Sequence, residues 1–317
     1  MSDNPKKSCE RASDVRRHAA LSNTIDKLKL FLLHALSWVS VRWHPRGTER
    51  LLRIAHHPDK RRNFAIRVQR RYFEGRCINI DTSSFCEWKI YFYGYYEESV
   101  ARFLAANAKQ NDIVVEVGAN IGSNTIILSE RVGPGGKVIA YEPSPAVLPK
   151  LRRNLALNTM SNVFVVESAV SDQCGYLPLY IPKGCIGTND MNASLLSGEL
   201  SEYECVNVPV VTLDHEVTMG RIHRPSLLKI DTEGNDFAVL RGAINLISKW
   251  RPTILFECSS KNDCWERDLS LLASRLSDLN YKLWLLDERK FRLLNLAGIS
   301  RSHTCDSDIV AIPNDRL

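Results

Sequence analysis

Short apolar runs alternate with longer amphipathic segments over most of this chain. Apart from single charged residues, the short runs are almost wholly apolar, which indicates strands buried on both faces of a sheet. They lie at residues 113–117, 163–166, 227–230 and 253–256. Between Trp265 and Leu279, apolar residues instead recur every three or four positions, as in a helix packed on a sheet. The alternation predicts an α/β fold, closed by two further strands at Lys282–Leu286 and Asp308–Ile312.

The first ninety residues follow a different pattern. Residues 1–20 are polar and charged and are predicted to be a disordered basic tail, followed by an extension at 21–90 and the main domain at 91–317. In the extension, Phe64–Phe73 and Arg76–Ile80 predict a β-hairpin. A helix is predicted before it, with one stripe of apolar residues. The stripe consists of Leu21, Ile25, Leu28, Leu32, Ala35 and Val39.

This helix is too short in its apolar part to span a bilayer. Two alternatives stay open. The stripe can pack on the main domain or on a second subunit of a homo-oligomer, which its continuity favours. Alternatively, Lys27, Lys29, Arg42, Trp38 and Trp43 suit a peripheral helix at a membrane surface.

The most informative motif is a glycine turn, Gly118–Gly122, between the strand at 113–117 and a helix expected from about Ser123. The next strand ends in Glu142, which can accept hydrogen bonds from ribose hydroxyls. Strand, glycine loop, helix, strand and acid form a nucleotide-binding unit. The glycines are expected to let the backbone approach a ligand closely. Because the middle glycine of a dinucleotide motif is missing and Glu116 would repel a pyrophosphate, the pattern favours S-adenosylmethionine (SAM), whose cations suit a carboxylate.

The run Glu-Val-Gly-Ala-Asn-Ile-Gly at 116–122 resembles the first motif of FkbM-type SAM-dependent methyltransferases, D-x-G-A-N-x-G. Further segments follow in family order between Tyr91 and Pro313. They are Tyr141–Pro145, Leu151–Asn158, Ala169–Asp172, Leu228–Gly234, Val239–Gly242 and Arg251–Glu257. Glu116 replaces the commoner Asp, and Asp236 stands where the family usually has Glu. The resemblance implies a class I, Rossmann-like methyltransferase sheet of seven strands in the order 3-2-1-4-5-7-6, flanked by helices.

The resemblance also implies which residues hold the cofactor. The loop after the third strand meets adenine in class I methyltransferases, which here points to Ser168 and the backbone near Ala169. Tyr95 and Tyr96 are additional candidates for lining the pocket. The predicted cofactor-binding residues are Glu116, Gly118, Ala119, Asn120, Gly122, Glu142, Pro143, Ser168 and Ala169.

Three carboxylates are predicted to carry the chemistry. Asp231 ends the strand at 227–230, Glu233 follows by two residues, and Glu257 ends the next strand, so all three meet at one rim of the sheet. One of them can act as general base on an acceptor hydroxyl. A divalent metal held by two of them is a less favoured alternative, because no histidine accompanies them. They can also simply cap helices or pair with Lys229 or Arg241.

Composition and charge limit the partners and the cellular compartment that the sequence predicts. The chain has 317 residues, 44% of them hydrophobic, and a net charge of +6. Residues 1–71 hold 17 Lys and Arg against 6 Asp and Glu, so the remainder, with 25 against 30, is mildly acidic. This distribution argues against nucleic acid on the active face and leaves the basic arm free for an anionic surface. Nine dispersed cysteines without a C-x-x-C pair and a charged N-terminus predict a cytoplasmic protein, membrane-associated if the helix meets lipid.

Together, these features predict methyl transfer from SAM to a hydroxyl of a sugar, glycan or polyketide-like metabolite. N-methylation and a SAM-binding module without turnover are the alternatives, and an NAD-dependent oxidoreductase is disfavoured by the glycine pattern. The sequence leaves the acceptor, the metal dependence and the oligomeric state open.

Overall fold

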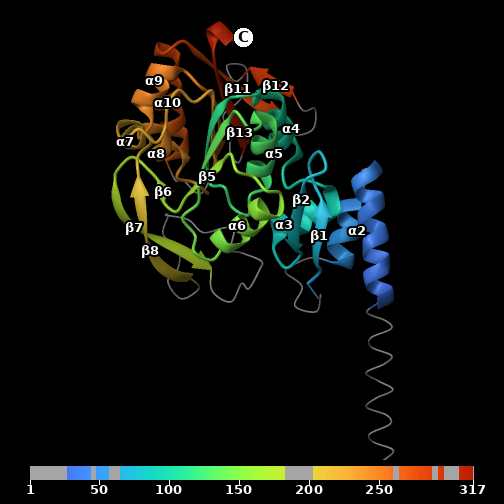
Figure 1. The fold of residues 1–317 in the computed structure, drawn as a ribbon. Coiled ribbons are helices and arrows are strands. Elements are labelled where there is room, and N and C mark those ends of the chain that lie inside the picture. Colours follow the sequence, from blue (N-terminus) through green and yellow to red (C-terminus); the bar gives the residue numbers. More distant parts are fainter. Residues whose placement is uncertain are drawn as a thin grey trace, which may run out of the picture.

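The computed structural model describes residues 27–43, 48–56, 65–182, 203–259, 264–287, 292–295 and 307–316. A central sheet lies between two groups of helices, with the N-terminal extension on one side and a small second sheet on the other (Figure 1). The predicted tail at 1–20 lies outside the described residues.

The central sheet has eight strands in the order β12-β11-β13-β10-β9-β3-β4-β5. Strands β10, β9, β3, β4 and β5 are parallel, whereas β13, β11 and β12 pair antiparallel. When the strands are numbered along the chain and β12 is left out, this order is 3-2-1-4-5-7-6. The strands are β3 (Ile113–Val117), β4 (Lys137–Tyr141), β5 (Val163–Val166), β9 (Leu227–Ile230), β10 (Thr253–Cys258), β11 (Tyr281–Asp287), β12 (Arg292–Asn295) and β13 (Ser307–Pro313).

The central strands are buried on both faces, as their apolar runs predict. Val114, Val115 and Val117 of β3 are at most 2% exposed, and Leu228 and its neighbours in β9 are equally buried. A parallel strand must be covered on both faces, and amphipathic helices supply that cover. Helix α10 buries Leu269, Leu272 and Leu276, most of the face that the sequence predicts.

Among the residues that the structure describes, helices occupy residues 27–43, here called the N-terminal helix, and ten further segments. These are α2 (Thr48–Ala55), α3 (Phe85–Tyr93), α4 (Glu98–Asn107), α5 (Ser123–Val132), α6 (Leu148–Leu157), α7 (Leu213–Thr218), α8 (Asp236–Arg241), α9 (Ile244–Trp250), α10 (Trp265–Asp278) and the 3₁₀ turn η3 (Asn314–Arg316). No helix in the described part of the chain is long and apolar enough to cross a bilayer.

The extension contains the predicted hairpin, formed by β1 (Arg67–Arg71) and β2 (Cys77–Asp81). One core cluster joins Leu33 of the N-terminal helix and Trp88 of α3 to Ile121 and Ile126, which belong to the glycine loop and α5. Helix α3 also crosses the expected boundary between residues 90 and 91. The extension therefore shares its core with the unit that carries the glycine loop.

The N-terminal helix packs on the protein through a face that the sequence analysis did not choose. Leu33, Ser37 and Ser40 are buried, and Ser37 Oγ donates a hydrogen bond to the carbonyl of Tyr91 at 2.6 Å. Leu28 and Leu32 of the predicted stripe are 59% and 51% exposed. The expectation that this stripe is the covered face is therefore wrong for the contacts within this chain, because Leu33 and two buried serines, of which Ser37 is hydrogen-bonded to Tyr91, occupy the inner face. Leu21 and Ile25 lie outside the described residues.

The small sheet was not predicted. It has the order β6-β8-β7 and consists of β6 (Ala169–Val170), β7 (Gly175–Pro182) and β8 (Tyr203–Val211). The polar segment at 183–205 shows no periodicity, from which a long loop is predicted. This prediction is wrong for residues 203–205, which belong to β8, and the rest of the segment lies outside the described residues.

Candidate active site

The carboxyl ends of β3, β4 and β9 open into a cavity of about 870 Å³, including its mouth. Most of the residues singled out in the sequence lie in its wall, although they come from distant parts of the chain. These are Gly118, Ala119, Asn120, Glu142, Pro143, Ser168, Ala169, Asp231 and Glu233. Glu116, Gly122 and Glu257 are not part of the wall.

The glycines of the loop are required by the protein itself. Gly118 has φ +81°, and a Cβ there would lie 1.8 Å from the carbonyl oxygen of Asp231. At Gly122, with φ +90°, a Cβ would lie 2.8 Å from Cδ1 of Leu151. Neighbouring protein atoms thus fill the space where a side chain would go, and close approach of this backbone to a ligand stays a prediction.

Four backbone N–H groups of the loop already donate hydrogen bonds within the protein. The acceptors are the carbonyl of Tyr141 for Gly118 and Ala119, both at 3.0 Å, Oε2 of Glu142 for Asn120 at 2.8 Å, and the carbonyl of Ala119 for Gly122 at 2.9 Å. A phosphate-binding loop needs such groups unpaired and aimed at the ligand. This loop therefore does not form a pyrophosphate clamp.

Glu142 lies in the cavity wall and is 6% exposed. Its Oε1 accepts a hydrogen bond from the backbone N–H of Ser144 at 2.9 Å, and its Oε2 accepts the one from Asn120. Burial raises the pKa of Glu142, while the two backbone hydrogen bonds oppose the rise. Because each carboxylate oxygen has two acceptor sites, both oxygens can still accept a ligand hydroxyl.

Glu116 lies behind the wall and is fully buried. Oγ1 of Thr125 donates a hydrogen bond to its Oε2 at 2.6 Å. Burial raises the pKa of Glu116 to about 7, and the charge of Lys229 opposes the rise. The structure thus gives Glu116 a place beneath the loop, and its direct contact with a cofactor stays a prediction.

Lys229 connects the glycine loop to Asp231. Its side chain is almost completely buried, and its Nζ lies 3.1 Å from Oδ2 of Asp231 and donates to the carbonyl of Gly118 at 3.2 Å. Burial acts to lower the pKa of Lys229, but Asp231, Glu116 and Glu97 raise it above its ordinary value. The result is a fixed ammonium that orients the Asp231 carboxylate at the cavity wall.

The remaining acids occupy different positions around this pair. Glu233 lies in the wall with φ +56°. Asp236 is 1% exposed and joins strand β10 to the loop after β9, since its Oδ1 accepts from the N–H of Glu257 at 3.2 Å and its Oδ2 from Oγ1 of Thr232 at 2.7 Å. Burial raises the pKa of Asp236 to about 6. Burial first, and then Asp231 and Asp236, raise the pKa of Glu257 to about 8, so Glu257 keeps its proton at neutral pH.

Sequence reasoning missed part of the site. Cys86, at the start of α3, lines the cavity. Of the two tyrosines that the sequence suggests, Tyr96 lines the cavity and Tyr95 does not. Glu97 adds another, partly buried carboxyl, whose pKa is raised well above its ordinary value by desolvation and then by Asp308 and Asp231. A carboxyl this far from Asp231 in the chain gives no sequence signal beyond its place after the paired tyrosines.

On the opposite wall, Ser168 and Ala169 follow the third parallel strand, as predicted for an adenine-binding loop. Val170 and Leu179 of the small sheet lie beside them. The wall here is largely apolar, which suits the face of a purine ring. Within the described ranges, no group of three or more His, Cys, Asp or Glu side chains is arranged to hold a metal ion.

A parallel sheet whose glycine loop and rim carboxylates enclose a cavity at the strand ends defines an α/β protein with a nucleotide-type cofactor site. Residues 116–283 match the methyltransferase FkbM domain, and the chain therefore belongs to the FkbM methyltransferase family.

Two curated relatives are similar over part of their length. The hexuronic acid methyltransferase AglP of Haloferax volcanii is 25% identical over 48% of this chain and 58% of its own. Methyltransferase sdnD of Sordaria araneosa is 29% identical over 43% of this chain and 62% of its own. The chain thus spans less than two thirds of the length of either relative.

Among solved structures, the methyltransferase FkbM from Methylobacillus flagellatus aligns with 63% of this chain and 43% of its own, at 19% identity and a TM-score of 0.39. A putative methyltransferase from Streptococcus mutans, solved in complex with SAH, aligns with 68% of this chain and 95% of its own, at 12% identity and a TM-score of 0.41.

Proposed function

We propose that the protein transfers a methyl group from SAM to a hydroxyl oxygen of a sugar, glycan or polyketide-like metabolite. Membership of the FkbM methyltransferase family supports methyl transfer. The similarity to a hexuronic acid methyltransferase supports a sugar acceptor, although it covers only about half of this chain.

The choice of SAM as cofactor rests mainly on the hydrogen bonding of the glycine loop. Its four N–H groups are already used within the protein, and the wall beside it contributes the carboxylates of Glu142, Asp231 and Glu233. SAM has a ribose, an ammonium and a sulfonium but no phosphate, so it matches such a wall where a dinucleotide does not.

A second observation concerns Asn120. Its buried Oδ1 has no hydrogen-bond partner among the described residues, although Asn120 lines the cavity. A buried amide oxygen without a donor is costly, and a ligand N–H or O–H group in the cavity would remove that cost. In this proposal Asn120 and the neighbouring loop backbone hold the amino-acid end of SAM, Glu142 holds the ribose, and Ser168 with Ala169 borders the adenine.

The residues of the protein supply the proton acceptor and align the acceptor hydroxyl with the methyl group. When bound, SAM provides an electrophilic methyl group on a positively charged sulfur. Asp231, oriented by Lys229, would take the proton of the acceptor hydroxyl, and SAM, giving up its methyl group to that oxygen, would leave as the neutral demethylated thioether. Because the raised pKa of about 8 favours the protonated form of Glu257 at neutral pH, this proposal assigns proton transfer to Asp231 and gives Glu257 the role of a neutral hydrogen-bonding group beside it. Most of the acceleration comes from holding the two reactants in line.

Calorimetry with SAM, its demethylated product and NAD tests the cofactor. Binding of the first two and none of NAD is the expected result, and tight NAD binding would refute the assignment.

Release of the demethylated product is then measured with hexuronic acid glycosides, polyketide-like alcohols and primary amines, each with and without a chelator. Turnover with hydroxyl acceptors is expected. Turnover with amines alone would establish N-methylation instead, and SAM binding without turnover on any acceptor would favour a non-catalytic module. Loss of activity in chelator would assign a metal to the acid rim.

A further inference from the structure

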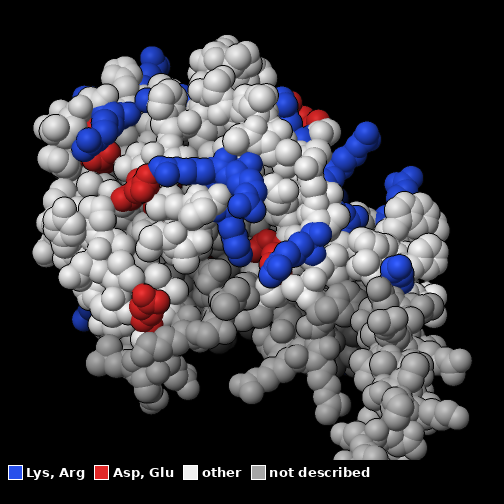
Figure 2. All heavy atoms as spheres, turned by 60° about the horizontal axis from the view of Figure 1, so that its bottom comes forward, with Lys and Arg blue, Asp and Glu red and all other residues white. Residues whose placement is uncertain are grey.

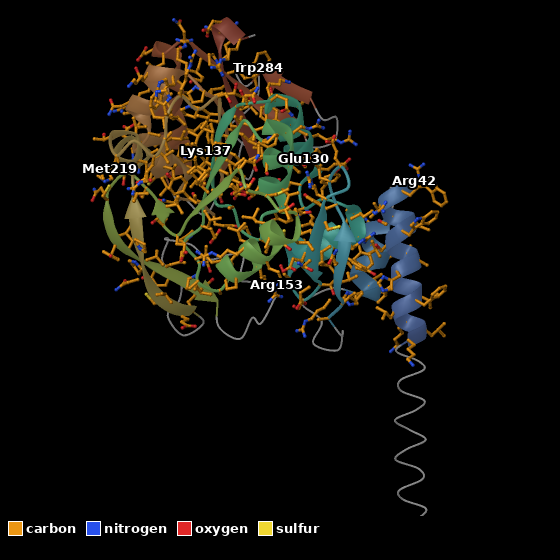
Figure 3. The ribbon with its side chains drawn as sticks, in the orientation of Figure 1. Arg42, Glu130, Lys137, Arg153, Met219 and Trp284 are labelled. Atoms are coloured by element: carbon orange, nitrogen blue, oxygen red, sulfur yellow. The ribbon has the colours of Figure 1, made fainter. Side chains whose placement is uncertain are left out.

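The N-terminal helix exposes a continuous apolar face to solvent. At about 100° per residue, Leu28, Phe31, Leu32 and Trp38 point away from the buried Leu33, Ser37 and Ser40, and the exposed Leu36 and Trp43 lie at the edge next to the buried side. We call this side the outer apolar face, and it consists of Leu28, Phe31, Leu32, Leu36, Trp38 and Trp43. Phe31 is 68% and Trp43 64% exposed, so these side chains are not covered by the described part of the chain. Figure 3 shows the helix at the outer edge of the molecule, with Arg42 near one end.

The charge around this face has one sign. Residues 27–43 contain Lys27, Lys29 and Arg42 and no acidic residue. Lys27 and Lys29 lie on either side of the outer apolar face, and Arg42 lies near its end. Figure 2 shows several Lys and Arg side chains on the right-hand side, where the helix lies in Figure 1.

Contacts with the protein fix the orientation of the helix, so that it would meet a flat surface lengthwise. Its inner side is bonded to the protein through Ser37 and through His34, whose Nδ1 lies 2.6 Å from the hydroxyl of Tyr91. The outer side therefore presents one lengthwise stripe. Trp38 and Trp43 lie at one end of it, with ring centroids 5.5 Å apart in an edge-to-face arrangement. Amphipathic tryptophans flanked by basic residues suit the boundary between lipid headgroups and acyl chains.

The charge of the helix distinguishes between two partners for this face, a second copy of the chain and an anionic membrane. A second copy packed symmetrically on this face would bring the same basic residues together, with no acid in either helix to balance them. An anionic lipid surface instead offers negative headgroups to the lysines and acyl chains to the apolar residues. We propose that the outer apolar face docks the protein on an anionic membrane surface, with the N-terminal helix lying in the plane of the headgroups. This surface is separate from the cavity and does not depend on the proposed function.

Co-sedimentation of the full chain with vesicles tests the apolar part. Vesicles of phosphatidylcholine with phosphatidylserine are compared with vesicles of phosphatidylcholine alone, at low and high salt. Binding only to the anionic vesicles, weakened by salt, is expected. The double variant Leu28→Ser and Phe31→Ser should bind about tenfold more weakly or worse, because it removes two side chains that would enter the lipid. Leu271→Ser is the matched control, since Leu271 on α10 is also 59% exposed.

The basic residues are tested separately. Lys27→Gln and Lys29→Gln should each weaken binding to anionic vesicles about fivefold. Lys282→Gln, exposed on β11, should leave binding unchanged. Equal binding to both vesicle types would overturn the proposal, as would no binding at all. A dimer in solution that the Leu28→Ser and Phe31→Ser variant converts to a monomer would also overturn it, because the face would then be covered by a second copy.

Discussion

Lys229 is the residue on which the charges of the site converge. Its ammonium is buried among Asp231, Glu116 and Glu97 and also donates to the glycine loop. Burying a charge without a partner is very unfavourable, so cation and acids depend on one another. Lys229 therefore stabilises the acidic side chains of the wall from a position behind the cavity.

Glu142 is expected to contribute directly to cofactor affinity. The change Glu142→Ala removes a carboxylate that can accept both ribose hydroxyls and should weaken SAM binding by about 1.5–3 kcal/mol. Calorimetry measures the loss. Glu204→Ala, exposed on β8, should bind SAM like the wild type. An unchanged affinity in Glu142→Ala would mean that the carboxylate only ties the loop to Ser144.

Asp231 is expected to affect turnover more than binding. In Asp231→Asn the amide cannot take the acceptor's proton, so the rate of methyl transfer should fall about 10²-fold or more. SAM affinity, measured in parallel, should be largely retained. Asp278→Asn, exposed on α10, is the control for the same chemical change elsewhere. Wild-type turnover in Asp231→Asn would leave the residue a structural role only.

At the scale of elements, the glycine loop and the end of β9 are in contact. The loop after β3 passes so close to Asp231 that no Cβ fits between them. The N–H of Asp231 also donates to the carbonyl of Val117 at 3.0 Å. The cofactor loop and the strand that carries the proposed base are therefore positioned by the same contact.

Substituting two glycines with similar φ angles would distinguish the cost of backbone strain from the cost of a steric clash with neighbouring atoms. Gly118 has φ +81° and Gly75 has φ +86°, but no described atom lies within 4 Å of a Cβ built at Gly75. Gly75→Ala should therefore cost about 1 kcal/mol, from the backbone alone. Gly118→Ala should cost roughly 2–4 kcal/mol and weaken SAM binding, because the loop must also move away from Asp231. Chemical denaturation and calorimetry compare the two variants, and equal costs would contradict this reasoning.

The sequence predicts some elements to the residue and others not at all. Strands β3 and β5 have the bounds expected from their apolar runs, since a strand buried on both faces leaves a continuous signal. Strands β7 and β8 were missed because they contain Pro178 and Pro209 and expose Tyr176, so neither strict alternation nor a continuous apolar run marks them. The inner face of the N-terminal helix was missed because two buried serines bear no mark of burial in the sequence.

Some residues of the candidate site could likewise be predicted from the sequence, and others could not. Residues next to a strand end, such as Glu142 and Asp231, could be placed because parallel strands bring their carboxyl ends to one edge. Glu116 was placed in the right region, but its position behind the wall could not be inferred, since a strand residue's side depends on its register. Glu97 could not be found, because only the packing of α4 brings it near Asp231.

At the scale of the whole molecule, stability depends on carboxyls that are buried with their protons. Glu257 has an ordinary pKa of 4.5 and a pKa of about 8 in the folded protein. The folded state therefore keeps a proton that the unfolded state releases between these values. This contribution to stability is complete below about pH 4.5 and is lost as the pH rises through about 8.

The variant Glu257→Gln should remove this dependence. Relative to the wild type, its free energy of unfolding should rise by about 2 kcal/mol between about pH 5 and pH 8.5, allowing for the partial exposure of the side chain. Denaturant unfolding at several pH values measures the difference. Glu204→Gln should follow the wild type at every pH. A constant difference between Glu257→Gln and wild type would show that Glu257 does not retain its proton in the folded protein.

The core cluster that joins the extension to α5 has a consequence for synthesis on the ribosome. Leu33 packs in the same cluster as Ile126, which is made 93 residues later. At about 5–20 residues per second, the N-terminal helix waits roughly 5–20 s for the partners of its inner face. During that interval both of its sides are open to solvent and to other nascent chains. A ribosome-bound chain that ends before Ile121 should therefore be cut readily by protease within the extension, whereas one that includes α5 should resist.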